Sequence, residues 1–191
     1  TLLGRMPSAV GYQPNLATDW EISDDGLTYT FTLREGVTFH DGTPFDAAVL
    51  KQNLDRPLGE PDLATVSTGI ASTEVVDEHT LAVTLSRPNA AFIHALSTPH
   101  WPIYSGAVLS AHSPAELSAD PTLSIGTGPF KVAKYTKGSS LVLERNDDYD
   151  WAPPSLEHQG RALLDSVTYS VAGEDSVRVG AVVSGQADAA R

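Results

Sequence analysis

The chain contains no cysteine, and this absence excludes several kinds of site at once. There can be no disulfide, no thiolate metal ligand and no thiol nucleophile. The sequence also lacks any apolar run close to the roughly 20 residues that a membrane-spanning helix needs. No charged and then apolar signal segment opens the chain, which begins TLLGRMPSAVG. We therefore expect a processed form or an excised part of a longer protein.

Basic side chains are scarce, with 12 Lys and Arg against 24 Asp and Glu, so the formal net charge is −12. Nucleic acids and anionic membrane surfaces are bound by clustered positive charge, and the composition argues against both as partners. What the chain does have is a hydrophobic fraction of 41% over 191 residues. This is enough for one sizeable core or two small lobes of a folded protein.

Alternating apolar residues predict strands and hairpins. In LTYTFTLR, residues 27–34, the side chains of Tyr29, Phe31 and Leu33 share one face, which is typical of a half-buried strand. Similar alternation predicts further strands, and the hairpin turns fall where Gly or charged residues interrupt it. These predicted elements are a hairpin over 72–85, a hairpin over 130–135 and 141–145, and a strand in LLDSVTYSV, residues 163–171.

Helices are predicted where capping residues precede helical spacing. Asp46 is the expected N-cap of a helix that ends near Arg56, because Pro57 cannot continue it. Shorter helices are expected with Asn89 as a cap, from Ser113-Pro114, and over 174–185, followed by a strand that starts at Ala187. Strands and helices do not alternate strictly, so the order predicts an α+β fold with a mixed sheet, hairpins and short helices.

The stretch FHDGTP, residues 39–44, poses the main chemical question, because it places His40 beside Asp41. A catalytic histidine needs an orienting carboxylate and a third group, and a metal site needs about three or four ligands. Asp41-Gly42 is turn chemistry, and Thr43-Pro44 leads into the helix capped by Asp46, so a turn is favoured. The remaining histidines form no zinc-hydrolase pair at helical spacing; they are His79, His94, His100, His112 and His158.

Three other stretches fail as motifs. GTGPF, residues 126–130, lacks the third glycine of a dinucleotide loop and the Gly-Lys-Ser/Thr of a triphosphate loop. NDDYD, residues 146–150, lacks the spacing and the distal glutamate of a calcium loop. VVSGQ, residues 182–186, lacks the first glycine of a nucleophile elbow. We therefore predict no catalytic residue, no metal site and no cofactor. Four aromatic residues in loops could line a binding cleft or close the ends of a sheet; they are Trp101, Tyr104, Tyr149 and Trp151.

Three blocks in order resemble the family 5 extracellular solute-binding proteins, the peptide, dipeptide and nickel-type receptors of ABC importers. The first block is PNLATDWEISDDGLTYTFTLREGVTFHDGTPFDAAVLKQNLDR, the second is GTGPFKVAKYTKGSSLVLERNDDY, and the third is DSVTYSVAGEDSVRVGAVVSGQADAA. Together they span residues 14–190. The chain departs from the family at Ala48-Val49 and in the insertion DWAPPSLEHQGRA, residues 150–162.

The resemblance implies a receptor with two lobes of the type II, cluster C periplasmic-binding-protein fold, which closes on its solute like a hinged clamp. It implies a small extra domain over about 14–125 and, over about 126–191, the end of that domain with part of lobe I, the second lobe being absent. The implied protein is a monomer, extracytoplasmic or lipid-anchored, that delivers a peptide or other small solute to an ABC permease. Peptides in such receptors are held largely through main-chain contacts, and the expected ligand-binding residues are Trp101, Tyr104, Gly126, Thr127 and Gly128.

Two other functions stay open. One is a histidine-dependent hydrolase that uses His40 and Asp41, and the other is a stand-alone interaction domain whose acidic surface docks on a basic partner. If the chain is part of a receptor, we expect it to bind the solute weakly or not at all by itself, because half of the burial is absent.

Overall fold

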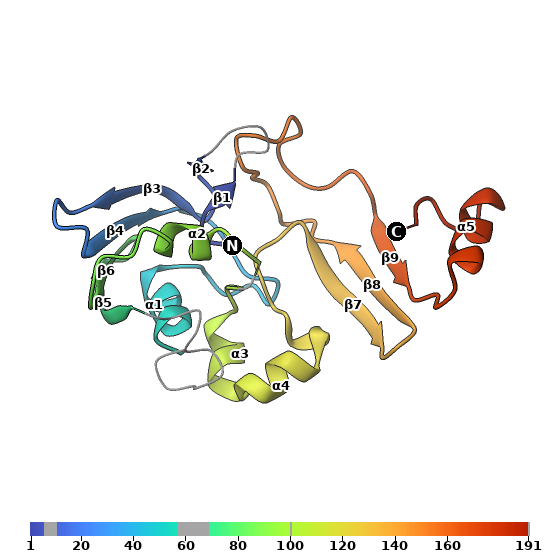
Figure 1. Ribbon diagram of the computed structural model, residues 1–191, viewed down its shortest axis with the longest axis horizontal. Coiled ribbons are helices and arrows are strands. Elements are labelled where there is room, and N and C mark those ends of the chain that lie inside the picture. Colours follow the sequence, from blue (N-terminus) through green and yellow to red (C-terminus); the bar gives the residue numbers. More distant parts are fainter. Residues whose placement is uncertain (6–10, 57–68, 100, 191) are drawn as a thin grey trace.

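The computed structural model describes residues 1–5, 11–56, 69–99 and 101–190. The described chain is elongated, with a four-stranded antiparallel sheet at one end and a three-stranded antiparallel sheet toward the other, and short helices packed beneath and between them (Figure 1). This is the α+β arrangement of hairpins and short helices that the sequence predicts. Within the described ranges, no helix is both long and apolar enough to cross a membrane.

The four-stranded sheet has the order β3-β4-β6-β5 and carries most of the core. Alternation in β4 buries Tyr29, Phe31 and Leu33, as predicted, and β6 buries Leu81 and its alternate neighbours on the same face. The β3–β4 turn contains Gly26 at a φ of 69°, which a residue with a side chain rarely adopts. The strands are β3 Ala17–Ile22, β4 Thr28–Leu33, β5 Ile70–Asp77 and β6 Thr80–Leu85.

Helix α1, Ala47–Asp55, packs against this sheet and is capped as predicted. The Asp46 carboxylate accepts a hydrogen bond from the Val49 amide at 2.8 Å, and Leu50 and Leu54 are fully buried. The predicted end near Arg56 is confirmed, whereas Pro57 lies outside the described residues.

The helix predicted to have Asn89 as its cap begins later than expected. Helix α2 covers Phe92–Leu96, and Ala91 holds its N-cap position without a side-chain bond. The Asn89 side chain accepts from the Ala91 amide at 3.0 Å, and its carbonyl accepts from the Phe92 amide. Asn89 therefore stabilises the turn that precedes the helix rather than capping the helix itself.

Two short helices and a 3-10 turn connect the sheets: α3 Gly106–Ala111, α4 Pro114–Ala119 and η3 Pro121–Leu123. The predicted helix start at Ser113-Pro114 is confirmed, because Ser113 and Glu116 form a capping box. A separate two-stranded ladder joins β1 Gly4–Arg5 to β2 Tyr12–Gln13.

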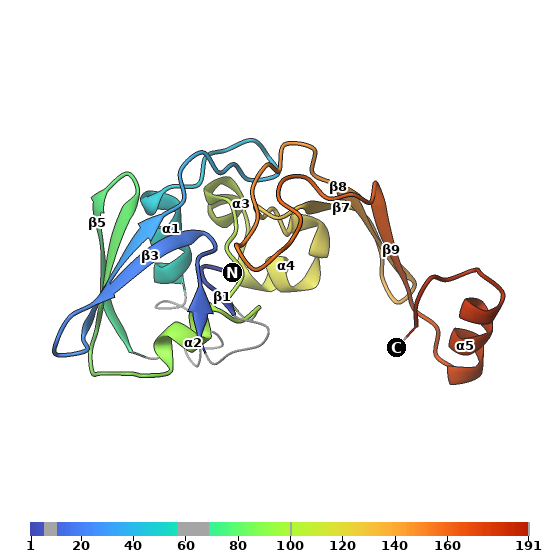
Figure 2. The ribbon, with the colours of Figure 1, turned by 90° about the horizontal axis from the view of Figure 1, so that it is seen from above.

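The three-stranded sheet has the order β7-β8-β9, with β7 Phe130–Thr136, β8 Ser140–Arg145 and β9 Ser166–Ser170. Helix α5, Asp175–Val183, stands at the far end of the molecule and buries none of its residues (Figure 2). The prediction of a strand that starts at Ala187 is wrong. The chain turns back after α5, and the backbone amides of Gln186 and Ala187 both donate to the Ala181 carbonyl. The domain division expected near residues 125/126 falls where the chain passes from η3 to β7, and it stays a prediction.

Candidate functional site

The FHDGTP stretch forms a turn between the four-stranded sheet and α1, as the sequence favours. The Phe39 amide donates to the Thr43 carbonyl at 2.8 Å, and Gly42 adopts a φ of 80°. The Asp41 carboxylate accepts from both the amide and the hydroxyl of Thr43, at 3.0 and 2.6 Å. Burial alone would raise the pKa of Asp41, but the hydrogen bonds from Thr43 and Ser105 outweigh it and lower that pKa.

His40 does not form a catalytic dyad with Asp41. Its Nε2 lies 3.0 Å from the Gly128 carbonyl oxygen, and its Nδ1 is buried with no hydrogen-bond partner among the described residues. Burial lowers the pKa of His40, so the neutral ring is favoured. The hydrogen bond between His40 and Gly128 joins this turn to the GTGP segment, residues 126–129. It does not align a nucleophile, a base and an orienting group, as a catalytic triad requires.

A cavity of about 410 Å³ opens between the two sheets, where the GTGP segment meets the connections that precede β3, α3 and β9. Its 13 lining residues are Thr1 and twelve residues of four connecting segments, and all of them lie outside the regular helices and strands. Clefts of this size, with mostly apolar walls and a few polar groups, are typical of small-molecule sites. The lining consists of Thr1, Asn15, Leu16, Pro102, Ile103, Gly126, Thr127, Gly128, Pro129, Tyr149, Trp151, Pro153 and Leu156.

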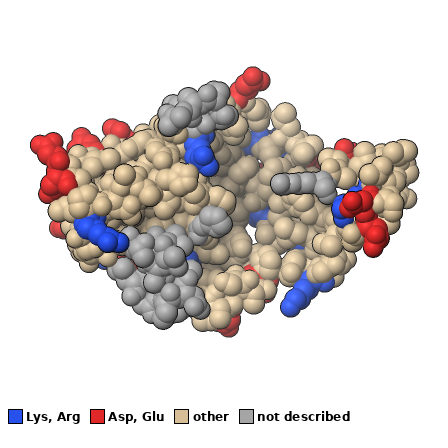
Figure 3. All heavy atoms as spheres, viewed as in Figure 1, with Lys and Arg blue, Asp and Glu red and all other residues tan. Residues whose placement is uncertain are grey.

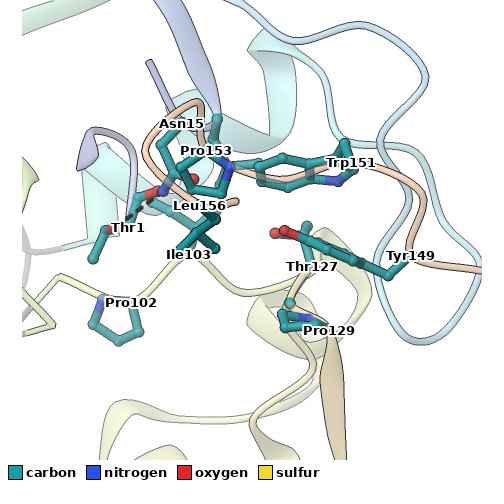
Figure 4. A pocket seen from close by; sticks show the side chains of 13 residues that line it. Thr1, Asn15, Pro102, Ile103, Thr127, Pro129, Tyr149, Trp151, Pro153 and Leu156 are labelled. Carbon is teal, nitrogen blue, oxygen red and sulfur yellow. Dashed lines mark hydrogen bonds between the residues drawn. The ribbon is translucent and has the colours of Figure 1, made fainter. Parts of the chain in front are cut away.

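Two aromatic side chains from the segment after β8 form one side of this cavity (Figure 4). The rings of Tyr149 and Trp151 lie 5.0 Å apart at a tilt of 40°. The Arg34 guanidinium lies 4.8 Å from the centre of the Trp151 ring, and its Nε donates to the Asn15 carbonyl at 3.0 Å. This cation–π contact holds the indole in place, so Trp151 presents a preorganised flat wall.

The polar side chains of the cavity are neutral. Burial raises the pKa of Tyr149, although the positive charge of Arg34 opposes this, so the phenol keeps its proton at neutral pH and can donate a hydrogen bond. The Asn15 side-chain Nδ2 donates to the carbonyl of Thr1 at 2.6 Å, and the Thr127 hydroxyl adds a second polar side chain (Figure 4). No Asp, Glu, Lys, Arg or His side chain occurs in the described lining. The arrangement can hold a solute but contains no acid–base pair.

The middle of the viewed surface, between the sheets, is hollowed, and some Lys or Arg atoms are visible in and beside the hollow (Figure 3). Acidic side chains stand at the two ends of this face and at its top and bottom edges. Among the described residues, no group of three or more His, Asp or Glu is placed to hold a metal ion.

The structure brings together three of the five residues that we expected to bind ligand. Gly126, Thr127 and Gly128 follow one another along the cavity wall. Trp101 instead lies in the core, with 2% of its surface exposed and its ring 6.5 Å from that of Phe92. Solute contact by the five expected residues stays a prediction.

Tyr104 also lies outside the described lining. Its backbone is bonded to Asn53 of α1, and its ring lies 5.1 Å from the Arg56 guanidinium. The flanking residues Pro102 and Ile103 line the cavity in its place. The sequence thus indicates this connecting segment, but it does not show which of its side chains face the cavity, because burial within a loop has no local sequence pattern.

The sequence marks Tyr149 and Trp151 as loop aromatics, but the five expected ligand-binding residues do not include them. A usable signal was present: two aromatics two positions apart, directly after a predicted strand and before a Pro-Pro pair. Their partner Arg34 is distant in sequence, so its role could be recognised only in the fold.

Comparison with known proteins identifies the family. A sequence model described as bacterial extracellular solute-binding proteins, family 5 Middle, matches residues 11–191. Among curated proteins, the glutathione-binding protein GsiB of Escherichia coli O1:K1 / APEC is 35% identical over 175 residues, which cover 90% of this chain and 32% of GsiB. The chain therefore spans about a third of the length of the curated relatives it matches.

Solved structures agree with this result. The periplasmic binding protein DppA of Helicobacter pylori, in complex with the peptide STSA, matches 97% of this chain and 39% of its own, with a TM-score of 0.79 and 29% identity. NikA of Brucella suis, in complex with Fe(III)-EDTA, matches 97% of this chain and 36% of its own, with a TM-score of 0.81 and 29% identity. The fold is thus part of the type II, cluster C periplasmic-binding-protein fold. With the family model matching nearly its whole length, the chain belongs to family 5 of the bacterial extracellular solute-binding proteins.

Proposed function

We propose that this chain is part of the solute-binding component of an ABC importer, which captures a peptide or a related small solute outside the membrane and delivers it to a permease. Family membership over residues 11–191 is the observation that carries the proposal. The cavity supports it physically, because its walls are apolar and aromatic and its polar side chains are neutral. Such a site desolvates a ligand and orients it through a few hydrogen bonds.

The solute class follows from the relatives and from the cavity together. GsiB is named for glutathione, the DppA structure holds a peptide and the NikA structure holds a metal chelate. Peptides and peptide-like thiols suit this chain better than a free ion, because the described cavity lining offers amide, hydroxyl and aromatic groups without a charged side chain. We therefore favour a peptide-like solute with main-chain amides.

The proposed receptor captures its solute without making or breaking bonds. The Asp41 carboxylate is engaged by Thr43, and His40 faces a backbone carbonyl. Capture then depends on closing a second wall over the solute, which the rest of the protein would supply. By this proposal the protein works as a monomer on the outer side of the membrane, either free or lipid-anchored.

Isothermal titration calorimetry of the whole protein tests this function. The panel contains dipeptides, tetrapeptides, glutathione and a nickel chelate, and the peptides are analysed afterwards for cleavage. We expect one class to bind at micromolar Kd or tighter and to be recovered intact, and the chain of 191 residues alone to bind it at least about a hundredfold more weakly.

Variants connect binding to the cavity. Trp151→Ala should weaken binding by about tenfold or more, because it removes a fixed aromatic wall. Tyr169→Phe is the control, since Tyr169 is an exposed residue of β9 and should bind like the parent protein. Binding of no member of the panel, or turnover of the peptides, would overturn the proposal.

A further inference from the structure

One backbone carbonyl, that of Gly128, links the turn before α1 to the segment after β8 of the three-stranded sheet. The Gly128 carbonyl accepts from His40 Nε2 at 3.0 Å and from Asn146 Nδ2 at 3.2 Å. His40 belongs to the turn before α1, and Asn146 follows β8 of the second sheet. The acceptor itself lies in the cavity wall. Two side chains from distant elements therefore hold the same atom of a candidate binding surface.

The geometry fixes the protonation of the histidine. A carbonyl oxygen only accepts hydrogen bonds, so Nε2 of His40 carries a proton. Its Nδ1 is buried and meets no partner among the described residues, so a second proton there would be left without an acceptor. The ring is therefore a neutral donor with one tautomer.

Asn146 is fixed equally well. It is 5% exposed, and its Oδ1 accepts from the Asp148 amide at 3.3 Å, which directs its Nδ2 toward Gly128. Its own amide donates to the Pro129 carbonyl at 2.9 Å. On the other side, the His40 amide donates to the Gly126 carbonyl at 2.8 Å. The segment is thus bonded through both backbone and side chains from each direction.

We propose that His40 and Asn146 are positioning residues, which clamp the Gly128 carbonyl between the two parts of the molecule and so set the place of the 126–128 wall in the cavity. Glycine at 126 and 128 brings no side chain to pack in the wall, so the hydrogen bonds from His40 and Asn146 help to define its position. In a receptor that must close on a solute, a wall fixed in advance lowers the ordering cost of binding. This last consequence rests on the proposed function, whereas the clamp itself does not.

Amide hydrogen exchange of the whole protein without solute tests the clamp. Two amides report on the segment: Ser105 donates to the Ile125 carbonyl at 3.0 Å, and Asn146 donates to the Pro129 carbonyl. His40→Ala should speed exchange at both by about fivefold to tenfold, the effect of one lost hydrogen bond, while amides in β4 keep the parent rate. Equal acceleration in β4, or none at the two reporters, would overturn the proposal.

Rescue separates positioning from general stability. His40→Gln can place an amide donor near the position of Nε2, and it should restore exchange to within about twofold of the parent. His158→Gln is the matched control, because His158 makes the same kind of bond, 2.7 Å from the Arg161 carbonyl, in an exposed loop. It should leave both reporters unchanged. Failure of His40→Gln to rescue would contradict the donor role.

Two further measurements complete the test. In the double variant His40→Ala with Asn146→Ala, acceleration at Ser105 should differ from the product of the single effects, because both side chains act on one carbonyl. A simple product would show that the two residues act independently. Nitrogen-15 shifts of the imidazole should report the Nε2–H tautomer, and an Nδ1–H tautomer would refute the geometry. These results do not require a solute, so the clamp can fail while solute capture is confirmed, or the reverse.

Discussion

Asn53 ties the cavity-lining segment to α1, and its removal gives a well-defined test of the fold around the site. The side chain is fully buried. Its Nδ2 donates to the carbonyls of Val49 and Tyr104, both at 2.9 Å, and its Oδ1 accepts from the Tyr104 amide at 2.8 Å. Tyr104 directly follows Pro102 and Ile103, which line the cavity.

Asn53→Ala removes all three hydrogen bonds and leaves the amide and carbonyl of Tyr104 without these partners. At about 1 kcal/mol for each bond, the free energy of unfolding should fall by about 3 kcal/mol. Asn53→Asp keeps an acceptor for the Tyr104 amide but loses both donated bonds, so we expect a loss of at least about 2 kcal/mol. The exposed neighbour Gln52 is the control, and Gln52→Ala should stay within about 0.5 kcal/mol of the parent.

Urea unfolding of the whole protein at pH 7, followed by circular dichroism, measures these differences at a common slope. If Asn53→Ala lost less than about 1 kcal/mol relative to Gln52→Ala, the Tyr104 segment would be held by something other than Asn53. The reasoning that positions Pro102 and Ile103 in the cavity would then be refuted.

Three further predictions concern the elements around the FHDGTP turn. Asp46→Ala should lower stability by about 1 kcal/mol through loss of the helix cap, whereas Asp46→Asn keeps the acceptor and should lose little; equal losses in urea unfolding would argue against the cap. Gly42→Ala should cost about 1 kcal/mol because its φ is 80°, while Gly173→Ala, also in open space but without a positive φ, should cost less; the reverse order would contradict the turn geometry. Burial lowers the pKa of His40 below its ordinary 6.5; the hydrogen bond to the Gly128 carbonyl and the Asp41 charge oppose this shift, and the Lys131 charge adds to it, so the unfolded chain binds the proton more readily. The stability that depends on neutral His40 should be fully present above pH 6.5 and should decline as the pH falls below it. In urea titrations between pH 7 and 5, His40→Gln should remove this part of the decline. A decline that persists in full would disprove the assignment.

The regular elements were predictable because their determinants are local. Alternation in β4 and the cap at Asp46 depend on neighbours a few residues away, and both are confirmed. The strand expected at Ala187 failed for the opposite reason. A strand needs a partner, whereas the Ala187 amide finds the Ala181 carbonyl at the end of α5.

The candidate site was only partly predictable. Gly126 to Gly128 were selected as a segment, and they line the cavity, although ligand contact is still untested. Trp101 was selected for its loop context but is packed in the core, since local sequence does not reveal which loop aromatic is buried. Contacts that shape the site join distant residues: Arg34 and Trp151 are more than a hundred positions apart, and His40 and Gly128 are 88 positions apart. Pairings at that separation are set by the fold and leave no periodicity to detect.

Fluorine NMR of the whole protein labelled with 5-fluorotryptophan tests the central claim most directly, because the described cavity contains one of the three tryptophans. When a solute identified by calorimetry is added to saturation, the Trp151 resonance should shift, whereas those of core Trp101 and of Trp20 on β3 should change little. A shift confined to Trp101 or Trp20, with the Trp151 resonance unmoved, would show that the solute is captured elsewhere and would contradict the account.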